Sequence, residues 1–340
     1  MRVAVAMSGG ADSSAVALLL KRKGYDVTGL HMRLHAQSDT TWASAQMAAK
    51  EIRVPLHLVD LSREFQELVI RPFVAGYSEG LTPSPCPICN RFIKLGFLLE
   101  RARAMGCDKI ATGHYVRVAG TADTPALMTG KDQSKDQSYF LFMLTRDILK
   151  YAVFPLGDFT KVQVREVLKR AGLIIEESEE SQELCFISRS DYRAFLSSHG
   201  VESCSGNIVD VQGNILGKHR GITGYTVGQR RGLGICGPRP HYVIRIDPRT
   251  QTVVVGTKEE TYVRSFQTGS INWLRSSPLS AGERFRVKVR STANAVLSTV
   301  VSVSSDAAEL EFDEPQSGIA SGQAAVLYSG ERVVGGGWIK

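Results

Sequence analysis

The chain has 340 residues, 43% of them hydrophobic, with 41 Lys or Arg against 34 Asp or Glu and a net charge of +7. This length excludes a small disulfide-stapled domain and predicts two or three folded domains. The first residues lead into an expected strand without a signal-peptide pattern, and no apolar run is long enough to cross a bilayer. We therefore expect a cytoplasmic protein with no membrane partner.

The first strand, at residues 3–7, runs into a loop of small residues at 8–13 and then into a helix at 15–22. The loop has little side chain, so its backbone N–H groups can approach an anion, and the helix directs its positive end to the same place. No lysine follows before Lys21, which excludes a Walker A loop, and the G-x-G-x-x-G fingerprint is absent. The Ser-Gly-Gly-x-Asp-Ser pattern is instead similar to the pyrophosphatase loop of enzymes that cleave ATP between its α and β phosphates.

Strand and helix patterns then alternate through the first half of the chain. Strands are predicted at residues 26–32, 55–61 and 109–115, and helices at 42–52, 64–74 and 91–105. Such alternation is typical of a parallel sheet that is covered on both faces and binds ligands at the carboxyl ends of its strands. We therefore expect the loop of residues 8–13, Met32 and residues 112–114 to meet at one edge, where Met32 and Gly113 would flank a purine.

Two cysteines, Cys86 and Cys89, form a CxxC in a proline-rich stretch. The prolines predict an extended loop there, followed by a helix that begins near Arg91. This places Cys89 at a helix N-terminus, where the macrodipole, Arg91 and Lys94 would stabilise its thiolate and make it a nucleophile. Cys185 lies between apolar neighbours, and by itself it is more often a core cysteine.

Three features of the middle of the chain are also predictable. Lys135, Asp136 and Gln137 precede an aromatic and apolar stripe, and we expect them to be free to contact a partner. Thr160 is the expected N-cap of a helix through Arg170 that Gly172 closes. The acidic run at residues 176–180 suggests a solvated linker.

The second half changes to short β patterns separated by turns, and it ends in what we predict to be a small antiparallel barrel. Residues 216–290 hold fourteen Lys or Arg and four acidic residues, which favours a nucleic-acid partner. The glycines and paired arginines at residues 221–234 suit contact with a phosphate backbone. The strand patterns lie at residues 207–211, 242–246, 252–256, 284–289, 297–303, 308–312, 324–328 and 332–339.

Six motifs in register, which together span nearly the whole chain, make it resemble the tRNA-specific 2-thiouridylases of the MnmA type. They are Ser-Gly-Gly-Ala-Asp-Ser-Ser (8–14), Cys-Asn-Arg-Phe-Ile-Lys (89–94), Ala-Thr-Gly-His-Tyr (111–115), Lys-Asp-Gln-Ser-Tyr-Phe-Leu (135–141), Ser-Gln-Glu-Leu-Cys-Phe-Ile (181–187) and Tyr-Thr-Val-Gly-Gln-Arg-Arg-Gly-Leu-Gly (225–234). The resemblance implies an α/β protein: an N-terminal parallel-sheet ATP pyrophosphatase domain at 1–198, a central tRNA-binding domain at 199–264 and a C-terminal antiparallel β-barrel at 265–340.

The same resemblance implies the reaction. ATP, with Mg²⁺, adenylates the C2 oxygen of the wobble uridine of a tRNA, and sulfur then replaces that oxygen with release of AMP and pyrophosphate. Cys185 would carry a persulfide received from a sulfur donor, Cys89 would be the catalytic nucleophile, and the two would close a disulfide that must be reduced. Asp12 of the loop would also be catalytic, and no DNA partner is expected.

The implied binding residues fall into two sets. Those implied for ATP are Ala6, Met7, Ser8, Gly9, Gly10, Ala11, Asp12, Ser13, Met32 and Gly113. Those implied for tRNA are Ser84, Pro85, Cys86, His114, Lys135, Asp136, Gln137, Arg290, Ser291 and Gln323.

The chain departs from the family at two of these places. Ser84-Pro85-Cys86 stands where many members have Asn-Pro-Asp, and Ser291 stands where some have an aromatic residue. Cys86, Cys89 and Cys185 together supply three thiolates for a 4Fe-4S cluster, so a cluster route stays open beside the persulfide route. Two other readings also stay open: another adenylating enzyme of this loop class, acting on a different RNA site or forming an amide, and a non-catalytic RNA-binding protein.

Overall fold

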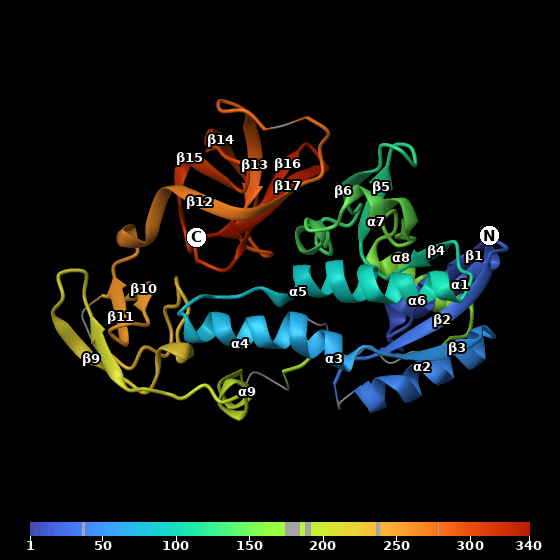
Figure 1. Cartoon of the computed structure of the whole chain (residues 1–340), viewed down its shortest axis with the longest axis horizontal. Coiled ribbons are helices and arrows are strands. Elements are labelled where there is room, and N and C mark those ends of the chain that lie inside the picture. Colours follow the sequence, from blue (N-terminus) through green and yellow to red (C-terminus); the bar gives the residue numbers. More distant parts are fainter. Residues whose placement is uncertain (36–37, 174–183, 188–191, 236–238, 278) are drawn as a thin grey trace.

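The computed structural model describes residues 1–35, 38–173, 184–187, 192–235, 239–277 and 279–340. It contains a five-stranded parallel sheet in the first half, a small four-stranded sheet in the middle and a C-terminal antiparallel sheet that closes into a barrel (Figure 1). The predicted fold class is therefore confirmed. In these ranges no helix is both long and apolar enough to cross a membrane.

The parallel sheet has the strand order β3-β2-β1-β4-β7. Its strands are β1 (Arg2–Ala6), β2 (Asp26–Arg33), β3 (Leu56–Asp60), β4 (Lys109–Ala111) and β7 (Ala152–Val153). The chain moves from β1 outward to β3 and then returns to the other side of β1 to form β4, so the order reverses between β1 and β4. Ligands of such sheets bind at this reversal, in the crevice at the carboxyl ends of the strands.

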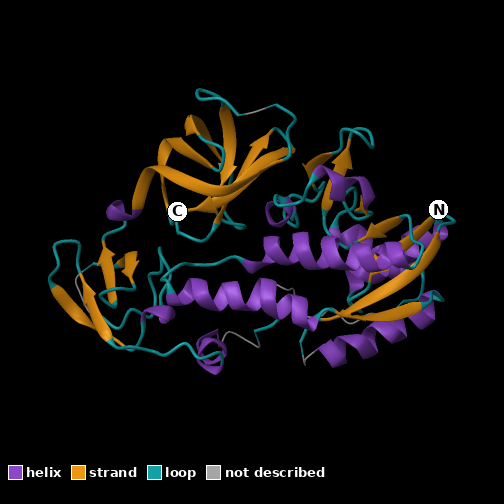
Figure 2. Ribbon diagram, in the orientation of Figure 1, coloured by secondary structure: helices purple, strands orange, loops and turns teal. Residues whose placement is uncertain are grey.

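Helices cover both faces of this sheet (Figure 2). Val3 and Val5 of β1 pack with one group of helices and Ala4 with the other, as the alternation of side chains along a strand requires. The first group is α1 (Ala11–Arg22), α2 (Ser38–Ile52) and α8 (Lys161–Arg170). The second consists of two helical runs, α3 (Ser62–Phe65), η1 (Gln66–Ile70) and α4 (Arg71–Ser78), and then α5 (Pro85–Ile88), η2 (Cys89–Phe97) and α6 (Leu98–Ala104).

The helix that carries the CxxC begins at Pro85, not near Arg91 as predicted. Proline suits the first turn of a helix because the N–H groups there have no intrahelical partner, so the prolines that predicted an extended loop are compatible with a helix start. The run continues as a π-helix over Cys89–Phe97, a form that is rare and frequent at functional sites.

The prediction for α8 is confirmed in detail. The Thr160 hydroxyl accepts from the backbone N–H of Gln163 (3.3 Å), and the Gln163 side chain accepts from the backbone N–H of Thr160 (2.8 Å), which is a complete capping box. Gly172 follows the last turn with φ +71°. This cap fixes the first residue of α8, Lys161, at the carboxyl edge of the sheet.

The second half is held to the first through the barrel. Its six strands are β12 (Tyr262–Trp273), β13 (Arg284–Lys288), β14 (Val296–Val303), β15 (Ala307–Ser317), β16 (Ala324–Ser329) and β17 (Arg332–Ile339), and pairing of β12 with β17 closes the ring. A hairpin of the first half, β5 (Val116–Ala119) and β6 (Ala126–Thr129), extends the barrel sheet beside β17.

The central sheet has the order β10-β11-β8-β9. Its strands are β8 (Gly206–Val209), β9 (Ile215–His219), β10 (Tyr242–Asp247) and β11 (Thr252–Gly256). Shorter helices are η3 (Ser138–Leu141), α7 (Arg146–Tyr151) and α9 (Tyr192–Ser198). The acidic run at 176–180 and the residues 181–183 before Leu184 lie outside the described residues.

Candidate active site

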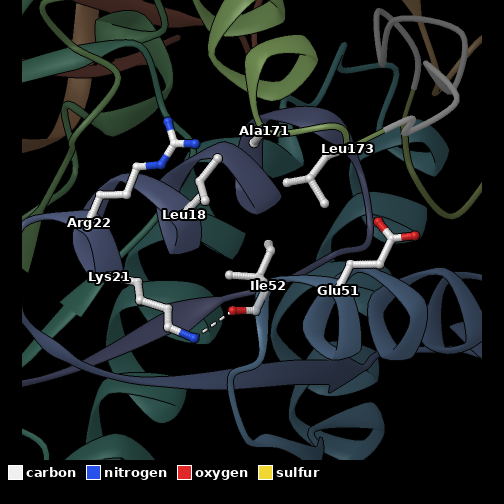
Figure 3. Close-up of a pocket in the computed structure, with 7 residues that line it drawn as sticks. All are labelled: Leu18, Lys21, Arg22, Glu51, Ile52, Ala171 and Leu173. Carbon is white, nitrogen blue, oxygen red and sulfur yellow. Dashed lines mark hydrogen bonds between the residues drawn. The ribbon is translucent and has the colours of Figure 1, made fainter.

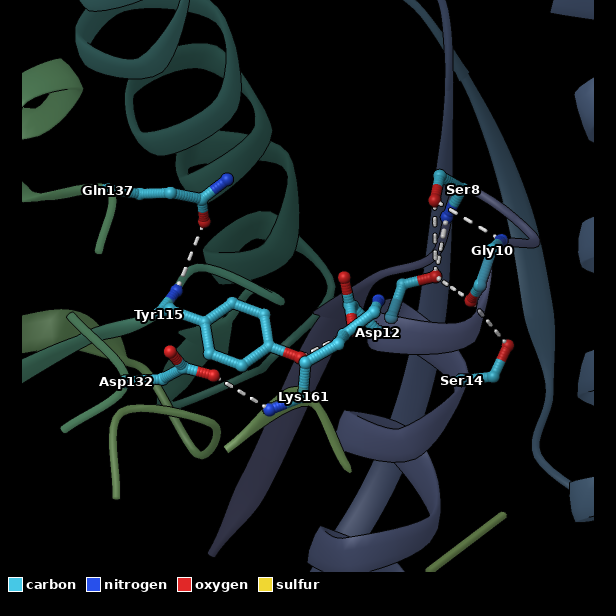
Figure 4. Close-up of polar contacts among 9 residues, drawn as sticks. Ser8, Gly10, Asp12, Ser14, Tyr115, Asp132, Gln137 and Lys161 are labelled. Atoms are coloured by element: carbon cyan, nitrogen blue, oxygen red, sulfur yellow. Dashed lines mark hydrogen bonds and ion pairs between the residues drawn. The ribbon is translucent and has the colours of Figure 1, made fainter. Parts of the chain in front are cut away.

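The loop between β1 and α1 is folded on itself by serine hydroxyls (Figure 4). Ser13 Oγ accepts from the backbone N–H of Ser8 (3.2 Å) and donates to the carbonyl of Gly10 (3.0 Å), to which the Ser14 hydroxyl also donates (3.0 Å). Gly10, the N-cap of α1, supplies no side chain to the N–H groups of the first turn. Those groups are therefore available to an anion placed in the loop.

Gly9 is required at its position for two reasons. Its φ is +84°, a conformation that residues with a side chain rarely adopt. A Cβ there would also lie 2.6 Å from the backbone N of Ala45 and 2.7 Å from Cβ of Ser44, both on α2. Helix α2 therefore closes one side of the loop by direct contact with its backbone.

Asp12 joins the loop to two distant segments. Its Oδ1 accepts from the Tyr115 hydroxyl (2.8 Å) and from the Lys161 ammonium (2.7 Å). The Lys161 side chain is only 16% exposed, and its backbone N–H donates to Asp132 (3.0 Å). Burial, with the Asp12 carboxylate beside it, raises the pKa of Tyr115, so the hydroxyl keeps its proton and remains a donor.

Sequence reasoning missed Lys161. The strand before it, β7, has two residues, which is too short to show a period-two pattern. Recognition of that strand would have placed Lys161 at the carboxyl edge of the sheet, beside the loop.

The carboxyl ends of β1, β2 and β4 lie at one edge of the sheet, as expected, and there Gly113 contacts the loop. Ala6 of β1 pairs with Leu30 of β2, two residues before Met32, and a Cβ on Gly113 would lie 3.1 Å from Cβ of Asp12. The end of β4 therefore packs against the loop at the point where the strand order reverses.

Cys86, Cys89 and Cys185, which we call the thiol cluster, gather around Lys94. All three are free thiols; Cys89 is buried, Cys86 is half-buried and Cys185 is exposed. Lys94 interacts electrostatically with each of them, and although burial opposes its charge, these interactions raise its pKa above the usual value. The structure thus brings Cys185, which is remote in sequence, to the CxxC.

The expectation of a lowered pKa for Cys89 is wrong. Burial raises the pKa of this thiol to about 12, and the Lys94 ammonium opposes the rise only in part. Because the helix begins at Pro85, Cys89 lies in its second turn rather than at its N-terminus. Arg91 does not face the thiol either, since its guanidinium donates to the carbonyl of Met143 (2.8 Å) and to Asn272 (3.5 Å).

The thiol cluster is not arranged as a metal site. In the described ranges, no three His, Cys, Asp or Glu side chains are placed so that they could hold a metal ion. The charge of Lys94 acts on all three thiols instead.

The end of β4 connects the loop to the thiol cluster. Burial, and then the charge of Lys94, lowers the pKa of His114 to about 3, so its imidazole is neutral and sits 2.7 Å from the Thr112 hydroxyl through Nδ1. The next residue, Tyr115, donates to Asp12. Consecutive residues thus interact with Lys94 and with Asp12 of the loop.

Family models match all three parts of the chain. They are described as "tRNA methyl transferase HUP domain" over residues 1–189, "tRNA methyl transferase PRC-barrel domain" over 193–257 and "Aminomethyltransferase beta-barrel domain" over 263–339.

Full-length relatives carry a more specific name. The tRNA-specific 2-thiouridylase MnmA of Syntrophotalea carbinolica is 43% identical over 99% of this chain and 98% of its own length. That of Paramagnetospirillum magneticum is 42% identical over 99% of this chain and 95% of its own length. The chain belongs to the MnmA family of tRNA-specific 2-thiouridylases.

Solved structures resemble this MnmA-family chain only distantly. One is a U34-tRNA thiolase NcsA from Methanococcus maripaludis with its [4Fe-4S] cluster, at 19% identity and a TM-score of 0.36, covering 58% of this chain and 65% of that one. A predicted subunit of a tRNA methyltransferase from Methanocaldococcus jannaschii matches at 19% identity and a TM-score of 0.37, covering 59% of this chain and 88% of that one. Neither bears on the site.

In this MnmA-family chain, the barrel contacts the segment before the CxxC. Gln323 Nε2 donates to the carbonyl of Thr82 (2.8 Å), and the backbone N–H of Thr82 donates to the carbonyl of Ser321 (2.8 Å). Thr82 lies two residues before Ser84, the first of the three residues implied to face the target base. The barrel therefore positions this stretch.

The segment of residues 135–137 is less free than expected. Asp136 accepts from the backbone N–H of Gly130 (2.9 Å) and from the Ser138 hydroxyl (2.7 Å). The Gln137 side chain accepts from the backbone N–H of Tyr115 (3.1 Å). Both side chains support the chain fold. On the barrel, Arg290 is exposed and Ser291 half-buried.

A separate pocket lies at the C-terminal end of α1, about 12 Å along the helix from the loop (Figure 3). Lys21 is held there, since its ammonium donates to the carbonyls of Ile52 (2.7 Å) and Arg53 (2.8 Å). The lining residues are Leu18, Lys21, Arg22, Glu51, Ile52, Ala171 and Leu173.

Proposed function

We propose that this chain uses ATP to replace the C2 oxygen of the wobble uridine of a tRNA anticodon with sulfur. The observation that carries the proposal is the union of an anion-binding loop and a thiol cluster at the end of β4, where Tyr115 faces Asp12 and His114 lies near Lys94. Membership of a family whose named relatives are tRNA-specific 2-thiouridylases supplies the substrate. Activation of an oxygen and delivery of sulfur are the two halves of this reaction.

The loop serves the first half. The carbonyl oxygen of uridine is a poor leaving group, so its O2 attacks the α-phosphorus of ATP, and the bond from that phosphorus to the bridging oxygen breaks. Pyrophosphate leaves with the Mg²⁺ that entered with ATP as part of the substrate. The open N–H groups at the start of α1 stabilise the charge on the departing phosphates.

The thiol cluster serves the second half. Cys185, exposed, receives a sulfane sulfur from an external donor, and the terminal sulfur of its persulfide attacks C2 and expels AMP. The Cys89 thiol loses its proton and attacks Sγ of Cys185, which breaks the sulfur–sulfur bond and releases the 2-thiouridine. A Cys89–Cys185 disulfide remains, and an added dithiol reduces it with two electrons.

A 4Fe-4S cluster fits the observed thiols less well. It would need the thiolates of Cys86, Cys89 and Cys185 as ligands, and in the described part of the chain these side chains do not form a metal-holding group. We therefore route no step through a cluster. Anaerobic purification decides the point: protein that is colourless, free of iron and active supports the persulfide route, and activity that requires iron contradicts it.

The tRNA would lie against the second half, whose residues 216–290 hold fourteen Lys or Arg against four acidic residues. Glycines and arginines at 221–234 suit phosphate contacts. On the barrel, Gln323 contacts the segment that leads to the CxxC, and Arg290 is exposed.

The test is gain of 2-thiouridine. The protein is incubated with Mg·ATP, a persulfide donor, dithiothreitol and unmodified tRNA, and the nucleosides are analysed by mass. We expect sulfur in the wobble uridine, AMP and pyrophosphate as products, and loss of product with Cys89→Ser or Cys185→Ser. Cys204→Ser is the matched control, since Cys204 is an exposed free thiol outside the cluster.

Each alternative gives a different result. Sulfur at another nucleoside would mean another RNA site, and tRNA binding without ATP consumption would mean a non-catalytic RNA-binding protein. A methylated nucleoside would favour a methyltransferase, the activity in the descriptions of the first two family models. Any of these contradicts the proposal.

A further inference from the structure

The loop of residues 8–13 has no lysine of its own, although it is proposed to hold two or three phosphates. The next lysine along the chain, Lys21, is at the far end of α1, and its ammonium is engaged by two backbone carbonyls. A departing pyrophosphate gains negative charge, and backbone N–H groups carry no full charge to balance it. Beside the Mg²⁺ that enters with ATP, a cation from elsewhere in the chain would stabilise this charge.

Lys161 is a cation in the right place. Its ammonium lies 2.7 Å from Oδ1 of Asp12, which is part of the loop and the second residue of α1. The lysine therefore reaches the loop from α8 (Figure 4). The side chain is 16% exposed, and its backbone is fixed by the capping box of α8 and by the bond to Asp132. Its position is thus built by three separate elements.

The contact with Asp12 can be exchanged. Asp12 is 34% exposed and accepts on Oδ1 from Tyr115 as well, so the carboxylate keeps a hydrogen-bond donor when the lysine leaves. The Lys161 side chain can turn about its stem without movement of its backbone, because a lysine carries a compact charge on four rotatable bonds.

We propose that Lys161 is the phosphate-binding lysine of this loop: it rests on Asp12 in the free protein and moves to the β or γ phosphate when Mg·ATP binds. The inference rests on the proposed use of ATP. It assigns to a residue of α8 the role that a lysine inside the loop has in the Walker A motif. Asp12 then holds the Lys161 ammonium while no ATP is bound.

The test compares ligands that differ in their phosphates. Binding of Mg·ATP, pyrophosphate and AMP is measured by calorimetry for the wild-type protein, Lys161→Met, Lys161→Arg and Lys169→Met. Met keeps the length of the stem without its charge, and Arg keeps the charge. Lys169 is the matched control because it is an exposed lysine on the same helix.

We expect Lys161→Met to weaken Mg·ATP and pyrophosphate binding about 10-fold or more, as loss of a charge-assisted hydrogen bond predicts, and to leave AMP within about twofold. Arg should restore most of the affinity, and Lys169→Met should change none. If Lys161 only orients Asp12, all three ligands weaken together, which overturns the inference. Unchanged pyrophosphate binding overturns it as well.

Two further readouts keep the outcome clear. For each variant we also measure how far pyrophosphate shifts the unfolding temperature relative to the same variant without ligand. If Lys161→Met does not fold, Lys161→Gln is used in its place. Wild-type protein that binds no Mg·ATP contradicts the proposed function and this inference together. Wild-type binding with an unaffected Met variant rejects the inference alone.

Discussion

Replacement of Gly9 by Ala tests the geometry of the anion-binding loop. Two costs add at this position: φ of +84°, and a Cβ placed 2.6 Å from the backbone N of Ala45. The left-handed conformation costs roughly 1–2 kcal/mol for a residue with a side chain. Overpacking against backbone that cannot move aside costs about 1–3 kcal/mol more. We therefore expect Gly9→Ala to lower the free energy of unfolding by about 2–5 kcal/mol.

Gly24→Ala isolates the first of these costs. Gly24 follows the last turn of α1 with φ +81°, and a Cβ there would meet nothing within 4 Å. Urea unfolding of both variants separates conformation from contact: Gly24→Ala should lose about 1–2 kcal/mol, and Gly9→Ala clearly more. Mg·ATP affinity should fall only for Gly9→Ala. Equal losses of stability in the two variants would refute the reasoning that α2 closes the loop.

Three further predictions concern the thiol cluster, its neighbour and the barrel contact. The pKa of His114 is lowered to about 3, so its contribution to stability is present above the unfolded pKa, about 6.5. That contribution is lost as the pH falls from about 6.5 toward 3, by at most about 1.4 kcal/mol per pH unit. Over this range the urea midpoint of His114→Gln should fall less steeply with pH than that of the wild-type protein. Cys89, with its pKa raised to about 12, should be alkylated by iodoacetamide at pH 8 more slowly than the exposed Cys204, as measured by peptide mass analysis. In Lys94→Met the alkylation of Cys89 should be slower still, because Lys94 lowers the pKa of this thiol. Alkylation of Cys89 faster than that of Cys204 would show that Cys89 is not a buried, protonated thiol. Asn272 donates to two backbone carbonyls of the first half, at 2.7 and 2.8 Å, so Asn272→Ala should cost about 1–3 kcal/mol in urea, and an unchanged midpoint would contradict a structural role for this contact.

Local signals in the sequence were sufficient for much of the fold. Thr160 and Gly172 mark the two ends of α8, and both were predictable because capping depends on residues within one turn of the helix end. The edge where the loop and Gly113 meet follows from the rule for parallel sheets, which depends only on the order of strands and helices.

Features that depend on tertiary context were missed. The two prolines beside Cys86 are compatible with either an extended loop or a first helical turn, and packing of the helix into the core decides between them. The strand β12 was not predicted; along it, buried residues alternate poorly with exposed ones, and Ser270 has φ +49°. The ion pair of Lys161 with Asp12 spans 149 positions, and the strand β7 that would have placed Lys161 beside the loop is too short to recognise from its pattern.

The pKa of Cys89 shows why charge arguments from sequence alone can fail. Lys94 does lower it, as the sequence suggested, but burial raises it by more. A Cys89 thiol that stays protonated is protected from oxidation, since the thiolate is the reactive form.

The central claim is that ATP activates the C2 oxygen of the uridine before sulfur arrives. A tRNA carrying a heavy-oxygen label at C2 of its wobble uridine tests it directly in a single turnover with Mg·ATP and the persulfide donor. The account predicts that the label appears in the phosphate of AMP, in an amount equal to the 2-thiouridine formed. Label in water or in inorganic phosphate, with AMP unlabelled, would contradict it.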